Sequence, residues 1–400
     1  MTPGALAARV AELDAAALWA SSGAMALTGD ADGPPLPVDA PVAAVVHAAG
    51  EALGLDDAAV LLGERAAIFG FTRRGRVSCG GGARLLPAAD GWVAVALPRP
   101  VDRSALPAWL GIDPPGDPWP AVALAVAGTE RAALVEGARL LEVPCTALGE
   151  HPAAPTPCAA TQSSHADPVR DPLVVDLSAL WAGPLCAQLI GGRVVKVEDP
   201  SRPDGARHAP QAFLGVLNAG KRSVAVDLAG AAGRRQLARL LDAADVVVSS
   251  SRPRAFEALG VDVDDVLARS PTVWVAVTAH GWEGPGRDRV GFGDDAAVAA
   301  GVVAAGPRFA ADAVADPLTG VLAAVAARAA LAKGGSWFVD APLVRAAAFA
   351  QSLAGAGGAP AGGGPAGGAA APPRARHPAA PAAALGADTD AVLAALAAAG

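Results

Sequence analysis

The sequence predicts an α/β protein, with a doubly wound, mostly parallel Rossmann-like sheet and a second, smaller α/β domain. Three observations lead to this prediction. Valine-rich runs alternate with helical patterns after residue 170, a stretch rich in proline precedes them, and the 400 residues exceed what one ordinary hydrophobic core organises.

Five short apolar runs are typical of buried parallel strands. They lie at residues 173–177, 194–197, 223–227, 246–248 and 273–277. Helical patterns separate several of them, one over residues 233–241 and another over 263–268. Strands that alternate with helices imply crossover connections between parallel neighbours.

An alanine-rich helix is expected over residues 317–332. Asp316 and Pro317 open it, as an acidic N-cap followed by proline at the first helical position. An Asp-Pro pair is typical of any helix start, so by itself it predicts a helix and does not indicate catalysis.

Composition divides the chain into five segments. A first region covers 1–150, a linker 151–168, the Rossmann-like domain 169–350, a Gly/Ala/Pro linker 351–375, and a C-terminal segment 376–400 with one short helix near 389–398.

Charge and cysteine usage exclude several classes of protein. A net charge of -8 argues against a nucleic-acid surface, which needs a clustered basic face. Charged residues, glycine or proline interrupt every long apolar stretch, so we expect neither a membrane span nor a signal peptide. The four cysteines are widely spaced, which predicts reduced thiols in the cytoplasm and no metal site.

Several blocks of sequence occur in the order found in one known family. They are Val175-Asp176-Leu177-Ser178, Ala182-Gly183-Pro184, Val195-Lys196-Val197-Glu198, Asn218-Ala219-Gly220-Lys221-Arg222-Ser223, Gly281-Trp282-Glu283-Gly284-Pro285 and Ala315-Asp316-Pro317-Leu318-Thr319-Gly320. On these blocks the chain resembles the family III CoA-transferases, the CaiB/BaiF group.

The N-terminal region resembles the smaller domain of that family, but it comes first in the chain. Residues 18–29 and Gly80-Gly81-Gly82 look like segments that normally follow the nucleotide-binding sheet. We therefore expect a permuted, or fused and trimmed, architecture. Residues 41–46 align weakly with residues 317–322 as an internal repeat. In this alignment Ala40 takes the position of Asp316.

The resemblance implies that Asp316 is a nucleophile. The family's aspartate attacks an acyl-CoA thioester, and an aspartyl-acyl anhydride and an aspartyl-CoA thioester follow. A carboxylate suits this chemistry because it is ionised at neutral pH. Gly81 and Gly82 would donate amide hydrogen bonds to a developing oxyanion, although a glycine run is also an ordinary flexible turn.

The resemblance also implies a site for coenzyme A. Its candidate residues are Ala182, Gly183, Pro184, Lys196, Lys221, Arg222, Ser250, Arg252 and Arg289, with Arg202 and Arg207 as further cations. Each cation has the alternative explanation of a solvated surface charge, and Lys221-Arg222 is the pair that we favour for binding. Residues 249–251 are all serine where the family usually has Glu-Asn-Phe beside the nucleotide, so CoA contacts are expected to differ here.

Two other functions stay open. Racemases and dehydratases that act on acyl-CoA share the fold, but Phe292 stands where the racemase motif has a histidine. A non-catalytic CoA-binding or scaffold subunit would explain the rearranged order. The partners expected are an acyl-CoA, a carboxylate and a second copy of the chain in a homodimer.

Overall fold

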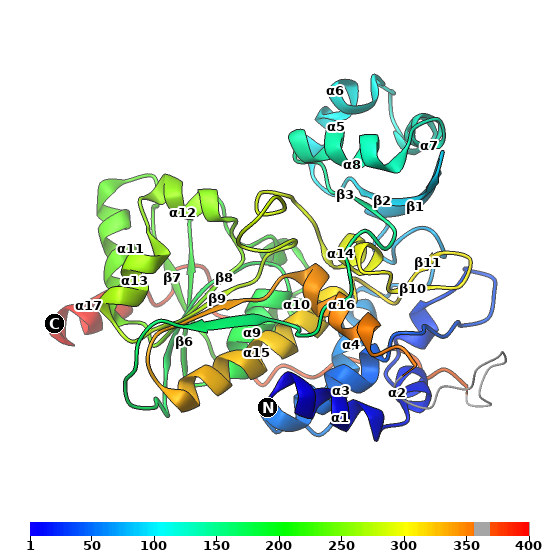
Figure 1. Cartoon of the computed structure of the whole chain (residues 1–400). Helices are drawn as coiled ribbons and strands as arrows, with labels where there is room; N and C mark the ends of the chain where they lie inside the picture. Colours follow the sequence, from blue (N-terminus) through cyan, green and yellow to red (C-terminus); the bar gives the residue numbers. More distant parts are fainter. Residues whose placement is uncertain (356–368, 400) are drawn as a thin grey trace.

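The computed structural model describes residues 1–355 and 369–399, and its largest element is a seven-stranded sheet (Figure 1). The strand order is β4-β12-β9-β8-β5-β6-β7. The strands are β4 (Ala159–Gln162), β5 (Leu173–Leu177), β6 (Arg193–Glu198), β7 (Arg222–Ala225), β8 (Val246–Ser249), β9 (Val273–Ala276) and β12 (Trp337–Asp340). β4 pairs antiparallel with β12, and every other pairing is parallel.

Strand order reverses between β5 and β8, because the chain builds outwards from β5 through β6 to β7 and then returns to β8. Helices cover both faces. Val174 and Val248 share one core with α9 and α15, whereas Val175 and Val247 face α11, α12 and α13. The predicted doubly wound α/β fold is confirmed.

The helices around this sheet fall into two layers. On one face lie α9 (Ala182–Ile190), α10 (Gln211–Asn218), α15 (Ala315–Lys333) and α16 (Leu343–Ser352); on the other lie α11 (Ala231–Ala243), α12 (Pro253–Leu259), α13 (Val263–Arg269) and α17 (Thr389–Ala399). By length and composition α15 is apolar enough to cross a membrane, but 72% of it is buried inside the protein. It is the central core helix.

The start of α15 differs from the sequence prediction. The helix begins at Ala315 with Val314 as its N-cap, and no side chain caps it. Asp316 therefore lies inside the first turn, and the prediction of an N-cap there is wrong. Pro317 is tolerated because amides of the first turn have no partner within the helix.

The first seventy residues pack on the main domain. They form α1 (Pro3–Ala11), α2 (Ala15–Ser21), α3 (Val42–Leu53) and α4 (Leu61–Phe69), and their buried side chains join the core cluster of α9 and α15. α3 lies against α15, so the two segments related by the weak repeat are neighbours in space.

A smaller antiparallel sheet, in the order β1-β2-β3, stands apart at the upper right of Figure 1. It consists of β1 (Ala83–Ala88), β2 (Gly91–Ala96) and β3 (Cys145–Ala147), with α5 (Pro100–Ser104), α6 (Leu106–Leu110), α7 (Trp119–Ala127) and α8 (Arg131–Leu140). One face packs on α6, α7 and α8, and the other on α14 (Gly293–Ala299). A short hairpin, β10 (Val303–Ala304) and β11 (Arg308–Phe309), follows α14.

The two segments predicted as linkers have different outcomes. Residues 151–168 contain β4, so this stretch also supplies an edge strand to the main sheet. Residues 356–368 of the predicted 351–375 linker lie outside the described residues. Beyond them the amide of Ala371 donates to the carbonyl of Ala20 at 2.8 Å. The division of the chain into domains stays a prediction.

Candidate active site

Asp316 is half-buried in the first turn of α15 and faces the start of α14. A Cβ built on Gly293 would lie closer than 3.0 Å to Asp316 Oδ2 and to the Ala313 carbonyl oxygen. Only a glycine allows this approach. Burial raises the pKa of Asp316 to about 6, while the charge of Arg65 and the amides of Gly293 and Ala182 lower it.

Two further aspartates on α14 adjoin this carboxylate. Burial, together with the charge of Asp312, raises the pKa of Asp294 to about 7, and burial raises that of Asp295 to about 8. Asp294 Oδ1 accepts the amide of Ala313 at 2.9 Å, so its carboxyl faces the turn before α15. At neutral pH Asp316 is mostly ionised, whereas Asp295 is mostly protonated.

Arg65 on α4 binds Asp312 through two hydrogen bonds. Nε donates to Oδ2 at 2.8 Å and Nη2 donates to Oδ1 at 2.5 Å. The Asp312 side chain is fully buried. The sequence did not identify Arg65 and Asp312, because no motif marks them and they are far apart in sequence. Asp294 lies in the stretch Gly291-Phe292-Gly293-Asp294 but was not predicted as a site residue.

The glycine run lies beside this cluster. A Cβ on Gly80 would lie 3.9 Å from Arg65 Nη2, and Gly81 has the left-handed φ of +78°. Cys79 Sγ donates to the Ala311 carbonyl at 3.3 Å, and burial raises the pKa of its thiol far above the usual value. The structure thus brings Gly80 near Arg65, although the catalytic role of Gly81 and Gly82 stays a prediction.

The turn after β5 meets the same site. Ala182 is the first residue of α9, and its carbonyl would lie 2.8 Å from a Cβ on Gly320, one turn into α15. A Cβ on Gly183 would lie closer than 3.0 Å to the side chain of Ser178. The predicted Ala182-Gly183-Pro184 turn therefore packs directly against the N-terminal end of the Asp316 helix.

The two lysines predicted to bind CoA phosphates lie inside the protein. Lys196 Nζ is 2.8 Å from Asp204 Oδ2, and Lys221 Nζ is 2.7 Å from Asp176 Oδ2. Lys196 is 2% exposed and Lys221 6%. Both ammonium groups are engaged in internal ion pairs, so a phosphate contact from either would require those pairs to open.

The remaining candidates are spread over the main sheet and its contacts with the segment around β3. The Arg222 side chain is 44% exposed and 3.6 Å from Asp388, whereas Arg207 is paired with Glu198. Arg202 is exposed and Ser250 is partly buried. Arg252 binds Glu142, and Arg289 binds Glu150, so both arginines tie the main domain to the segment around β3.

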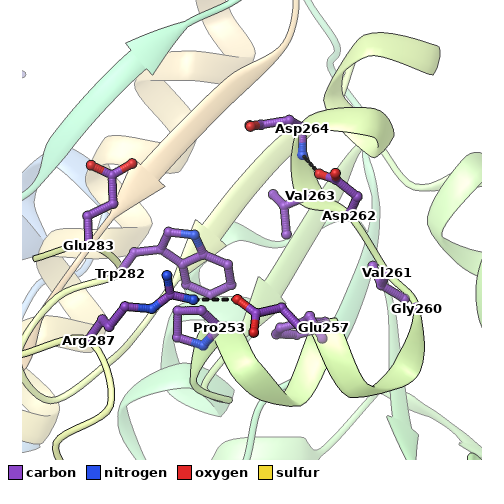
Figure 2. A pocket seen from close by; sticks show the side chains of 11 residues that line it. Pro253, Glu257, Gly260, Val261, Asp262, Val263, Asp264, Trp282, Glu283 and Arg287 are labelled. Carbon is purple, nitrogen blue, oxygen red and sulfur yellow. Dashed lines mark hydrogen bonds and ion pairs between the residues drawn. The ribbon is translucent and has the colours of Figure 1, made fainter.

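A cavity of about 490 Å³ lies at another place, between α12, the start of α13 and the loop after β9. Figure 2 shows the Arg287–Glu257 ion pair beside Trp282 at its base. Its lining also carries Asp262, Asp264 and Glu283. This excess of carboxylates is unsuited to the phosphates of CoA, so the cavity is not our candidate nucleotide site.

Fold and site together define a doubly wound α/β protein with a half-buried carboxylate at the meeting point of two helix starts. Residues 170–399 match the sequence profile of CoA-transferase family III, which is more than half of the chain. This protein belongs to CoA-transferase family III.

Individual relatives match over shorter stretches. The probable fatty acyl-CoA transferase Rv3272 of Mycobacterium tuberculosis is 35% identical over 158 residues, which are 36% of this chain and 40% of that protein. Succinyl-CoA–D-citramalate CoA-transferase of Chloroflexus aurantiacus is 34% identical over 32% of this chain and 34% of its own length. A crystal structure of Rv3272 is 31% identical, has a TM-score of 0.42, and overlaps 48% of this chain and 57% of that one. The chain thus spans well under two thirds of each relative.

Proposed function

We propose that this protein transfers coenzyme A between an acyl-CoA thioester and a carboxylic acid, with Asp316 as the nucleophile. One observation carries the proposal. Asp316 is a half-buried carboxylate whose pKa the nearby amides of Gly293 and Ala182 lower, and it lies at the start of the helix that packs on the turn after β5.

The proposed reaction runs in covalent steps. The Asp316 carboxylate attacks the thioester carbonyl, the C–S bond breaks, and an aspartyl-acyl anhydride and CoA thiolate form. The thiolate then attacks the aspartyl carbonyl, which releases the donor acid and leaves an aspartyl-CoA thioester. The acceptor carboxylate reverses both steps, so Asp316 is regenerated.

The surroundings of Asp316 suit this chemistry. A pKa of about 6 leaves the group mostly ionised at pH 7, yet makes it a stronger base than a free carboxylate. Each attack places negative charge on a carbonyl oxygen. The amide of Gly82, in the loop beside Arg65, is our proposed donor to that oxyanion. Gly81 would be a second donor once its amide releases the Ser78 carbonyl, to which it donates at 2.8 Å.

We place CoA at the carboxyl ends of β5 and β8, where the strand order reverses and ligands of doubly wound sheets bind. The Ala182-Gly183-Pro184 turn and Ser250 line this edge, and the exposed Arg202 follows the carboxyl end of β6. Arg222 begins β7, which runs parallel to β6, so it lies at the opposite edge of the sheet. The other predicted cations are already in ion pairs and would mainly stabilise the structure around the site; they are Lys196, Lys221, Arg252 and Arg289.

One observation favours a second candidate, proton transfer beside the thioester carbonyl. His280 Nε2 is buried without a partner among the described residues, and it lies near Gly291, two residues from the glycine that contacts Asp316. Burial lowers the pKa of His280 to about 3, which leaves the imidazole neutral but makes it a weak proton acceptor. Deuterium incorporation into an acyl-CoA without any acceptor would identify this activity.

The test of CoA transfer is a trapped covalent adduct. The protein is incubated with a panel of acyl-CoAs, quenched with hydroxylamine or borohydride, and mapped by mass spectrometry. We expect modification at Asp316 that is absent in Asp316→Asn. Asp39→Asn is the matched control, since this exposed aspartate lies beside the repeat-related Ala40 and should leave labelling unchanged. Unmodified protein that also fails to bind CoA by calorimetry would favour the scaffold function.

We also propose a cytoplasmic location and a homodimer. The four cysteines are free thiols, which supports a reducing compartment. Analytical ultracentrifugation of the purified chain tests the dimer, and a monomer at all concentrations would rule it out.

A further inference from the structure

We propose that Arg65, which α4 contributes from the N-terminal part of the chain, is a positioning residue that fixes Asp312 and supplies the counter-charge for Asp316. This inference rests on the proposed function of Asp316. Arg65 lies outside residues 170–399, the part that matches the family, whereas Asp316, Ala182 and Gly293 lie within it.

The geometry of Arg65 is that of a fixed group. Its guanidinium donates twice to the fully buried Asp312, and its Cζ atom is 5.0 Å from the ring centre of Trp181 and 5.9 Å from that of Phe71. Trp181 immediately precedes Ala182, whose amide reaches Asp316. Arg65 is therefore held between Asp312, which precedes α15, and Trp181, which precedes α9.

The groups that face Asp316 are mostly acidic. Asp312 precedes α15, and Asp294 and Asp295 are on α14. The charge of Arg65 acts on Asp316, Asp294 and Cys79 alike. Without it, the four carboxyl groups of these aspartates, that of Asp316 included, would share a poorly solvated space, and the added repulsion would favour the protonated form of Asp316.

The chain offers a matched control one residue away on the same helix. Glu64 is fully buried and accepts from Arg376 at 2.7 and 2.8 Å, so this pair resembles Arg65–Asp312 in geometry and burial. However, Arg376 is not among the charges that act on Asp316. Loss of either arginine should destabilise the fold, but only the loss of Arg65 should change the nucleophile.

The experiment is a titration that needs no turnover. The full chain is labelled with ¹³Cγ-aspartate, and the Asp316 signal is assigned by its absence in Asp316→Asn. We compare wild type, Arg65→Met, Arg65→Lys and Arg376→Met, and record the urea midpoint of each variant. Arg65→Met should raise the titration midpoint of Asp316 by about one pH unit or more, the usual effect of losing a neighbouring opposite charge.

The other variants separate positioning from structural support. Arg65→Lys keeps the charge and should restore most of the wild-type midpoint, and Arg376→Met should lower stability with an unchanged titration. If Arg65→Met fails to fold, Arg65→Lys decides, because its single ammonium should still give a small upward shift. An unchanged titration in every folded Arg65 variant overturns the proposal. Absence of a trapped adduct on Asp316 in wild type would instead count against the proposed function, and the titration would still report on Arg65.

Discussion

The hydroxyl oxygen of Ser250 accepts a hydrogen bond of 2.9 Å from the backbone amide of Ala179. This bond joins the carboxyl end of β8 to that of β5, across the place where the strand order reverses. The serine run at 249–251 stands where the family usually has Glu-Asn-Phe. Here one of these serines, Ser250, links the segments that follow β5 and β8.

Ser250→Ala should weaken CoA binding as well as the fold. The substitution leaves the amide of Ala179 without its partner, which costs about 1–3 kcal/mol. We expect a threefold to tenfold increase in the Kd for CoA by calorimetry, which corresponds to about 1 kcal/mol. Ser251→Ala is the control, because no hydrogen bond of the Ser251 side chain is present in the described residues. Equal affinities in both variants would place CoA elsewhere.

Formation of the Asp316 adduct should depend on pH with a midpoint near 6. The pKa of this group is raised to about 6, so the nucleophilic carboxylate disappears as the pH falls through that value. We expect a plateau above pH 7 and an initial rate about tenfold lower at pH 5. Quenched-flow labelling with circular dichroism at each pH provides the measurement. A flat profile between pH 5 and 8 would show that another group limits the reaction.

Gly293→Ala should reduce both adduct formation and stability. The new Cβ would overlap Asp316 Oδ2 and the Ala313 carbonyl, so α14 and α15 must separate. Overpacking of this kind costs about 1–3 kcal/mol. Gly4→Ala on α1 has open space around the added methyl group and should be neutral or stabilising by up to about 1 kcal/mol. Urea denaturation and adduct yield test both, and full labelling of folded Gly293→Ala would contradict the close approach.

Lys221→Met should be among the most destabilising single changes in the main domain. It leaves the carboxylate of Asp176 buried without its ammonium partner, and breaking such pairs costs about 3–5 kcal/mol. The exposed pair Arg269–Asp242 is the comparison, and Arg269→Met should cost less than about 1 kcal/mol. If denaturation midpoints shift equally, the interior pair does not support the fold.

The sheet was predictable because strands buried on both faces are nearly continuous in valine, as at 173–177 and 246–248. Burial of polar groups was not predictable in the same way. Lys196 lies in a run that predicts a buried strand and Lys221 in a polar block, but neither sequence shows that the ammonium group is inside the protein and paired. A local pattern carries no information about which distant carboxylate a lysine meets.

The residues of the candidate site also fall into those that local sequence predicts and those that only packing brings together. Asp316 and Ala182 were found because they lie in blocks of recognisable spacing. Arg65 and Asp312 come together only when α4 docks beside α15, and neither lies in a motif. The start of α15 was also misplaced by two residues, because an Asp-Pro pair fits both an N-cap and a first turn.

The origin of Arg65 in α4 has a practical consequence for anyone who builds chimeras from this family. A graft that takes only the stretch from β5 to α15 would carry the acidic trio of α14 and α15 into a new host without its arginine. A chimera should therefore take α4 from the same parent protein as α14 and α15, even though these helices are far apart in the sequence.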